Sequence, residues 1–224
     1  GAGSAGRTYD FDTIITELRT YQPNTLVFAD VALYKYADLR WVGNESGEVP
    51  YENWNVMDRA GYLRWRPVEA DTPLHRGHWF WHANDESTLR SVDELLDIYT
   101  KTVGRGAQLM LGLAPDDTGQ LPAADVKRLA EFGAALHRSY GQTLAAQGHA
   151  AAAEHEAVDN DPGTFWVAPP SHATLELQFD KPITFDRAVT MEQLNDGQHV
   201  EEYAIEVWKE GAWQPPVHAH AIGH

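Results

Sequence analysis

The sequence predicts an α/β fold followed by an antiparallel β-sandwich, and three observations support it. Short apolar runs alternate with helical stretches over about the first 140 residues, which is typical of a parallel sheet covered by helices. After about residue 142 the helical pattern gives way to stretches in which apolar and polar residues alternate. Gly, Pro and Asp clusters separate these later stretches, as in β-sandwiches. We therefore expect two domains, residues 1–142 and residues 143–224.

Two elements and a long irregular segment open the α/β region. Residues 9–22 have apolar side chains at helical spacing, and Asp10 or Asp12 can cap this helix. Residues 25–31 form a short apolar run, which predicts a buried parallel strand. The aromatic segment 34–82 shows little periodicity, and segments of this length in compact domains are usually functional or carry small elements of their own.

Three further elements complete the α/β region. An apolar stripe predicts a helix over residues 87–103, with Ser87 preferred as its N-cap because Ser91 lies inside the stripe. Residues 107–113 are a second candidate for a buried strand. Residues 122–140 have the periodicity of another helix.

The region after residue 142 is expected to consist of antiparallel strands. The alternating stretches that predict them are residues 174–179, 188–194 and 203–208.

Composition narrows the classes of partner. The chain has 17 Lys and Arg against 33 Asp and Glu, so its formal net charge of −16 argues against a nucleic-acid or anionic-membrane partner. No apolar run reaches the roughly 18 residues that a membrane-spanning helix needs. With 0 Cys, the chain has no disulfide and no thiolate metal site. The 8 Trp on an acidic chain suit carbohydrate binding, because flat rings pack on sugar faces.

Glu45 is the first candidate proton donor. It ends the segment Arg-Trp-Val-Gly-Asn-Glu at residues 40–45, which follows the first predicted strand. In barrels of alternating strands and helices, the loops after the strands hold the active site. Aromatic walls would remove water from the carboxyl group and favour its protonated form, whereas a solvated loop glutamate is the alternative. The aromatic residues expected around it are Trp41, Tyr34, Tyr36 and Trp54.

Glu69 is the competing acid. A run of rings follows it, in which Trp79 and Phe80 could contact the apolar face of a sugar or pack in the core. His78 and His82 flank these rings and could line a pocket, but a core or surface role is equally consistent with the sequence.

Four segments, in this order, resemble the second half of the catalytic barrel of α-L-fucosidases of glycoside hydrolase family 29. The resemblance covers about residues 1–140 and is strongest to the branch that acts on α-1,3/1,4-linked fucose. It implies that the α/β region is the second half of a (β/α)8 TIM-like barrel. The four segments are residues 40–45, 77–82, 91–99 and 109–116.

The resemblance also implies a reaction. Members of this family are retaining hydrolases that use an Asp nucleophile and a Glu acid/base, and Glu45 matches that Glu, with Glu69 as the alternative. It further implies a fucosylated oligosaccharide as substrate, no cofactor, no catalytic metal, and a secreted or periplasmic location. The expected sugar contacts are Trp41, Trp79, Phe80 and His78.

The family's nucleophile would stand immediately before Gly1. A complete barrel takes about 250 residues. We therefore expect the chain to be a fragment that is inactive alone, with a truncated sandwich. The alternative function is that of a non-catalytic carbohydrate-binding protein.

Residues 157–166 resemble the start of a galactose-binding-like, or discoidin-like, β-sandwich. In such modules an Asp-rich turn often helps to hold a structural Ca²⁺ through its oxygens. Asp159, Asn160 and Asp161 are the candidate ligands here, and an ordinary Asx turn is the alternative.

Overall fold

The computed structural model describes residues 6–29, 35–54, 65–169, 173–195 and 197–222. The chain divides into two compact units, residues 1–129 with 190–224 and residues 130–189. The boundary expected at residue 142 separates two domain families, which a division into compact units does not test, so it stays a prediction. Within the described ranges, no helix combines the length and apolar character that crossing a bilayer requires.

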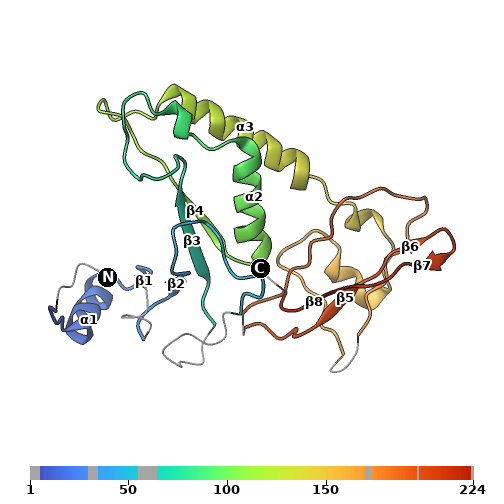
Figure 1. Ribbon diagram of the computed structural model, residues 1–224. Coiled ribbons are helices and arrows are strands. Elements are labelled where there is room, and N and C mark those ends of the chain that lie inside the picture. Colours follow the sequence, from blue (N-terminus) through green and yellow to red (C-terminus); the bar gives the residue numbers. More distant parts are fainter. Residues whose placement is uncertain (1–5, 30–34, 55–64, 170–172, 196, 223–224) are drawn as a thin grey trace. The chain divides into compact units, whose positions relative to one another are not determined.

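A parallel sheet of four strands forms the centre of the first unit (Figure 1). Its strands are β1 (Phe28–Ala29), β2 (Leu39–Trp41), β3 (Val68–Pro73) and β4 (Gln108–Gly112). Each pairs in parallel with the next strand along the chain. This sequential order is that of a barrel sheet, whereas a doubly wound sheet reverses its order at a switch point. The α/β class with a parallel sheet is confirmed, and the half-barrel stays a prediction.

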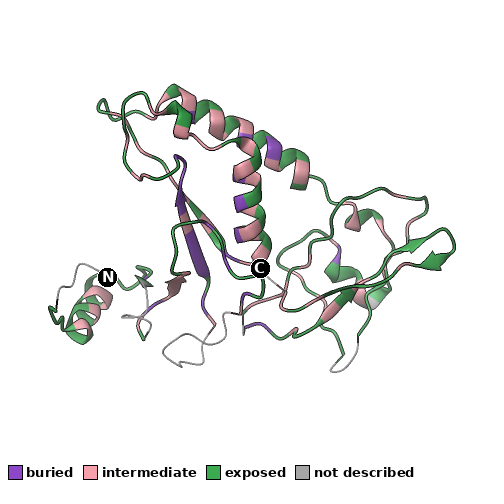
Figure 2. Ribbon diagram, in the orientation of Figure 1, coloured by how far each residue is buried: buried purple, intermediate pink, exposed green. Residues whose placement is uncertain are grey.

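The core of the sheet lies around β3, which is buried along almost its whole length (Figure 2). Val68 and Ala70 pack in one cluster with Val49 and Ala107. Both β2 and β3 lie within the segment that showed little periodicity in the sequence. Acidic residues alternate with small or apolar ones in β3, so its hydropathy does not mark it as a buried strand.

Helix α1 (Phe11–Tyr21) begins where the sequence predicted. Of the two expected caps, Asp10 is the one used, because its carboxylate accepts a hydrogen bond from the Thr13 amide at 3.1 Å. None of the α1 side chains is buried.

Helix α2 (Val92–Thr102) buries Leu95 and Ile98 and lies beside β4 (Figure 1). The preference for Ser87 as its cap was wrong. Ser91 is the N-cap, in a capping box with Glu94 in which each side chain bonds the other's backbone amide.

The apolar stripe includes Leu89, which lies before α2 as the C-cap of a 3-10 turn (Glu86–Thr88), and this explains the misplaced cap. Arg76 donates hydrogen bonds to Glu94 and thereby lowers the pKa of Glu94 to about 2.

Helix α3 (Ala123–Tyr140) confirms the third predicted helix.

The C-terminal residues form fewer strands than expected. In the first unit, β5 (Tyr203–Ile205) pairs antiparallel with β8 (Val217–Ala219), and β6 (Trp208–Lys209) pairs with β7 (Ala212–Trp213). These pairs confirm antiparallel structure at residues 203–208, while the sandwich stays a prediction.

The strands predicted at residues 174–179 and 188–194 are wrong for the residues that the structure describes. A single bridge between Gln178 and His149 is the β-pairing found there. Alternation of residue types sets which face a side chain occupies, but a strand also needs a partner for its backbone.

Candidate active site

The loop after β2, residues 42–49, is fixed by backbone hydrogen bonds to its neighbours. The Gly47 amide donates to the Asp71 carbonyl at 3.0 Å, and the Val49 amide donates to the Lys101 carbonyl at 3.2 Å. Asp71 belongs to β3 and Lys101 to α2, so the loop is held by both elements.

Gly47 is required at its position in this loop. Its φ of +72° is one that side chains rarely adopt, and a Cβ there would lie 2.8 Å from Ile98 Cγ2 and 3.1 Å from Thr72 Cγ2. The loop can therefore approach α2 and β3 this closely because residue 47 has no side chain.

Glu45 lies in this loop, after the carboxyl end of β2. Its side chain accepts a hydrogen bond from the Trp79 indole, with Nε1 and Oε2 3.0 Å apart. In this chain Glu45 is exposed, so the expected enclosure of its carboxyl group by aromatic rings is wrong. An indole N–H that donates to a carboxylate nevertheless fixes where that carboxylate points.

Three of the four rings expected around Glu45 have other contacts or line a different pocket. The Trp41 indole donates to Asp71 at 2.6 Å, and the Tyr36 hydroxyl donates to Asp12. Trp54 lines a separate pocket, and Tyr34 lies outside the described residues. Trp79 is the ring that takes their place.

Trp79 packs against the last residue of β4. A Cβ on Gly112 would lie 2.4 Å from Cζ3 of the Trp79 ring, so the absence of a side chain at Gly112 makes room for the indole. Through this packing and its hydrogen bond, Trp79 connects the end of β4 to Glu45. Phe80, the next residue, is 80% exposed.

Glu69 lies in a different environment, near the beginning of β3. It is 5% exposed, and its position in the sheet is opposite Trp41. Burial, followed by repulsion from Asp71, raises the pKa of Glu69. Asp71 is two residues further along the strand and therefore on the same face.

The two candidate acids thus differ in both position and solvation. Glu45 follows the carboxyl end of a parallel strand, where the catalytic groups of barrel enzymes gather. Glu69 is near the opposite end of its strand, but its burial favours the protonated form that a proton donor needs. Either carboxyl group can in principle exchange a proton with a bound hydroxyl or ether oxygen.

Within the described part of the chain, the polar contacts of His78 are with residues other than Glu45 and Glu69. Its Nε2 lies 3.4 Å from Asp85 Oδ2, and its Nδ1 lies 3.0 Å from the Phe80 carbonyl oxygen.

The sequence analysis missed Asp71, although the Glu-x-Asp spacing could have placed it beside Glu69 on one strand face. It also missed Asp125, which contacts His75 from 50 residues away along the chain.

The Asp-rich turn has the hydrogen bonds of an Asx turn. The Asp159 carboxylate accepts from the Asp161 amide at 2.9 Å and from the Thr164 hydroxyl at 2.7 Å. The first of these bonds is the main cause that lowers the pKa of Asp159. Asn160 has a φ of +63°, which Asn tolerates better than most residues. Calcium binding by Asp159, Asn160 and Asp161 stays a prediction.

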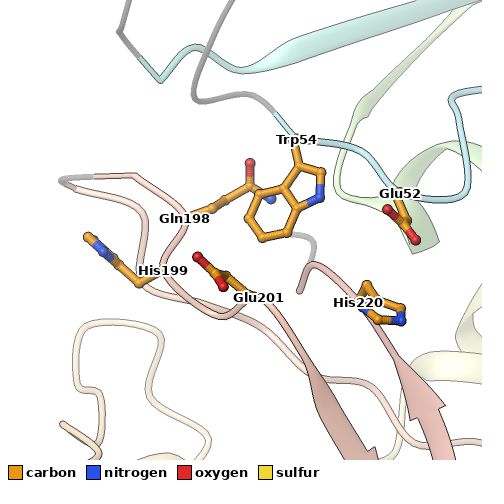
Figure 3. Close-up of a pocket in the computed structure, with 6 residues that line it drawn as sticks. All are labelled: Glu52, Trp54, Gln198, His199, Glu201 and His220. Carbon is orange, nitrogen blue, oxygen red and sulfur yellow. The ribbon is translucent and has the colours of Figure 1, made fainter. Parts of the chain in front are cut away.

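A separate pocket of about 550 Å³ lies in the first unit (Figure 3). The Trp54 ring lies among the acidic and amide side chains that surround it, as Figure 3 shows. Its lining residues are Glu52, Trp54, Gln198, His199, Glu201 and His220.

Comparison with known proteins decides the family. The model of the family described as alpha-L-fucosidase matches residues 18–141, more than half of the chain. The chain belongs to the α-L-fucosidase family. Among curated members, the putative alpha-L-fucosidase 1 of Oryza sativa subsp. japonica is 26% identical over 100% of this chain and 48% of its own length. The chain spans about half the length of the curated α-L-fucosidases it matches.

Solved structures of similar proteins share the fold. The crystal structure of SpGH29 has a TM-score of 0.86 and 26% identity, over 100% of this chain and 54% of that one. A putative alpha-L-fucosidase from Bacteroides thetaiotaomicron has a TM-score of 0.85 and 25% identity, over 96% of this chain and 53% of that one.

Proposed function

We propose that this chain forms part of a retaining α-L-fucosidase that removes terminal α-1,3- or α-1,4-linked L-fucose from glycans. The observation that carries the proposal is the position of Glu45, in a fixed loop after β2 with its carboxylate bound by the Trp79 indole. Family membership supports the hydrolysis of fucosides. A secreted or periplasmic location is consistent with a glycan substrate and is part of the proposal.

Glu45 is proposed to act twice in a double displacement. In the first step its proton goes to the glycosidic oxygen, while an Asp carboxylate forms a bond to the anomeric carbon and the aglycone leaves as an alcohol. In the second step Glu45 takes a proton from water, whose oxygen displaces the Asp and gives fucose with its configuration retained. Retention requires the two carboxyl groups roughly 5–5.5 Å apart. The Asp is the residue that the family resemblance places before Gly1, in a longer chain.

Glu69 remains the alternative proton donor. Its raised pKa supports that role, whereas its place near the beginning of β3 favours Glu45.

Trp41, Trp79 and Phe80 are proposed as sugar contacts. The indole N–H groups of the two tryptophans donate to Asp71 and Glu45, and both side chains are half-buried, so part of each ring is accessible to a sugar. Phe80, the residue after Trp79, offers an exposed ring. His78 is proposed to act through the backbone of Phe80, since its Nδ1 contacts that carbonyl.

The test compares Glu45→Gln with Glu69→Gln in a chain extended upstream to include the expected Asp and the first half of the barrel. Loss of a general acid costs about 10²–10⁴-fold in rate. We expect this loss for Glu45→Gln on natural glycosidic linkages and a much smaller loss on aryl fucosides, whose leaving groups need less protonation. A larger, leaving-group-dependent loss in Glu69→Gln would assign the role to Glu69.

A non-catalytic carbohydrate-binding protein is the second candidate. The pocket around Trp54 favours it, because an indole with carboxylate and imidazole groups can pack against a sugar and bond its hydroxyls. Calorimetry with fucose and with Lewis trisaccharides separates the candidates. The binding function is supported over the hydrolytic one if the extended chain binds these sugars without turnover and Trp54→Ala abolishes the binding.

A further inference from the structure

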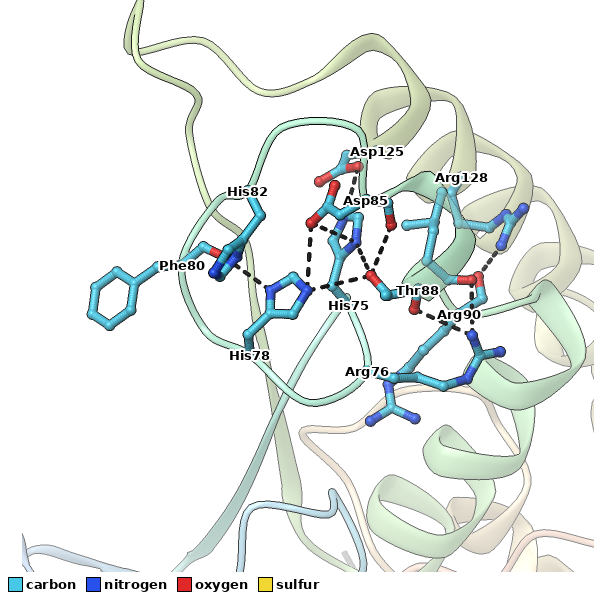
Figure 4. Close-up of polar contacts among 11 residues, drawn as sticks. His75, Arg76, His78, Phe80, His82, Asp85, Thr88, Arg90, Asp125 and Arg128 are labelled. Atoms are coloured by element: carbon cyan, nitrogen blue, oxygen red, sulfur yellow. Dashed lines mark hydrogen bonds and ion pairs between the residues drawn. The ribbon is translucent and has the colours of Figure 1, made fainter.

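A second polar cluster lies in the connection between β3 and α2 (Figure 4). His75, His78 and Asp85 each bring one ligand atom to it, and these three atoms lie within 4.8 Å of one another. His75 is buried, and the other two side chains are half-buried. Neither acid proposed for fucoside hydrolysis belongs to this cluster.

We propose that His75, His78 and Asp85 form a Zn²⁺ site. Their ligand atoms would be His75 Nδ1, His78 Nε2 and Asp85 Oδ2. The Asp85 oxygen lies 3.5 Å from His75 Nδ1 and 3.4 Å from His78 Nε2. In a tetrahedral Zn²⁺ site with bonds of 2.0–2.2 Å, neighbouring ligand atoms are about 3.3–3.6 Å apart. The two distances from the Asp85 oxygen fall in this range, and the two nitrogens lie within 4.8 Å of each other.

The remaining nitrogen of each imidazole is already used as a donor. His75 Nε2 lies 3.0 Å from the carboxylate of Asp125, which is 1% exposed, and His78 Nδ1 lies 3.0 Å from the Phe80 carbonyl. Both partners are acceptors, so these nitrogens carry the hydrogens. Zinc-binding histidines in proteins are held by these same two types of partner.

This arrangement directs three hydrogen-bond acceptors at one another. With hydrogens on the outer nitrogens, His75 Nδ1 and His78 Nε2 present lone pairs to the Asp85 carboxylate, which also only accepts. The Thr88 hydroxyl lies 2.9 Å from His75 Nδ1, 3.4 Å from His78 Nε2 and 2.8 Å from the Asp85 backbone carbonyl. It has one hydrogen, so it can donate to one of these acceptors and leaves the others. A cation among the three acceptors satisfies all of them at once.

The ligand set suits Zn²⁺. Two neutral imidazoles and one carboxylate suit Zn²⁺ and leave its fourth position for water or for the Thr88 hydroxyl, whose oxygen lies 2.9 Å from His75 Nδ1. Asp125 belongs to α3, so the metal would connect the 75–85 loop to that helix through His75. Trp79 follows His78 in the same loop, and the site would thus also steady the ring that contacts Glu45.

Metal content and affinity of the full 224-residue chain test the proposal. After treatment with a chelator and addition of Zn²⁺, we expect about one Zn²⁺ per chain by mass spectrometry of the metal. We also expect X-ray absorption to show nitrogen and oxygen ligands at about 2.0–2.1 Å. Calorimetry should give at least about 10-fold weaker binding for His78→Ala and for Asp85→Asn. Asp125→Asn, which changes only the partner of His75, should weaken binding by about 10–100-fold.

His149→Ala is the matched control, because His149 forms an exposed pair with Asp180 at 3.1 Å in another part of the chain. This variant should bind Zn²⁺ as the parent chain does. The proposal is overturned if the parent chain binds no Zn²⁺, or if folded His78→Ala and Asp85→Asn, checked by circular dichroism, bind it as tightly as His149→Ala. Binding lost equally in all three variants would also overturn it.

Discussion

The loop at residues 42–49 and strand β3 each carry an acidic residue next to a tryptophan, but they solvate that residue in opposite ways. The loop leaves Glu45 exposed and fixes it with one indole hydrogen bond, whereas β3 buries Glu69 and raises its pKa. Both depend on the same parallel sheet. Burial favours Glu69 as the catalytic acid, whereas position after the carboxyl end of a strand favours Glu45. Burial alone therefore does not identify the catalytic acid.

Replacing Gly47 by Ala tests how far the loop depends on its close approach to β3 and α2. The added Cβ would meet Ile98 and Thr72, and the backbone has a positive φ, so we expect unfolding to become easier by about 2 kcal/mol. Denaturant unfolding followed by circular dichroism measures this.

Gly119→Ala is the matched control for Gly47→Ala. Gly119 also has a positive φ, of +83°, but nothing lies within 4 Å of its Cβ position. The free energy of unfolding of Gly119→Ala should fall by about 1 kcal/mol, the cost of the backbone conformation alone. Equal losses in the two variants would mean that the loop does not depend on packing at Gly47.

Trp79→Phe tests the link between the loop and β4. The smaller ring still packs near Gly112, but the donor to Glu45 is lost, and we expect a loss of stability of about 1 kcal/mol. A double-mutant cycle with Glu45→Ala, which removes the acceptor, isolates the hydrogen bond. Additive effects of the two substitutions would show that the bond contributes nothing in solution.

Glu69→Gln tests the burial of the strand carboxyl through pH, and we expect this effect to be the smallest. Because the folded pKa is raised, the folded chain holds its proton more strongly than the unfolded chain does. Stability should therefore fall as pH rises above the ordinary value of 4.5 towards the folded pKa. Glu69→Gln should remove this fall, as measured by urea unfolding at a series of pH values.

Asp71→Asn separates the two causes of that shift. Burial is the larger cause and repulsion from Asp71 the smaller, so this variant should keep most of the pH dependence. If Asp71→Asn removes all of it, the carboxyl of Glu69 responds to charge and not to burial.

The elements that the sequence predicted best are those with regular apolar spacing. Helices α1, α2 and α3 follow from periodicity and strand β4 from its apolar run. Burial was predicted less well, because no residue of β4 and no side chain of α1 is buried. Strand β3 was missed because Glu69 and Asp71 replace apolar residues on one of its faces. The predicted strands at residues 174–179 and 188–194 had alternation without backbone partners.

The candidate site was predictable in its residues but less so in their environments. The segment that ends at Glu45 marked the loop, yet nothing in the sequence showed that Trp79, 34 residues away, supplies its hydrogen bond. The cluster of His75, His78 and Asp85 depends on Asp125, which a distant helix contributes. Contacts of this kind arise from the fold and leave no local pattern.

Azide rescue of Glu45→Ala, in the chain extended to include the expected Asp and the first half of the barrel, tests the central claim most directly. Azide is an anion that needs no base to deprotonate it, so it can replace the water that Glu45 would activate. The account predicts that azide restores turnover of an aryl fucoside and gives α-L-fucosyl azide, with the configuration of the substrate retained. If azide rescues Glu69→Ala and leaves Glu45→Ala inactive, Glu45 is not the acid/base.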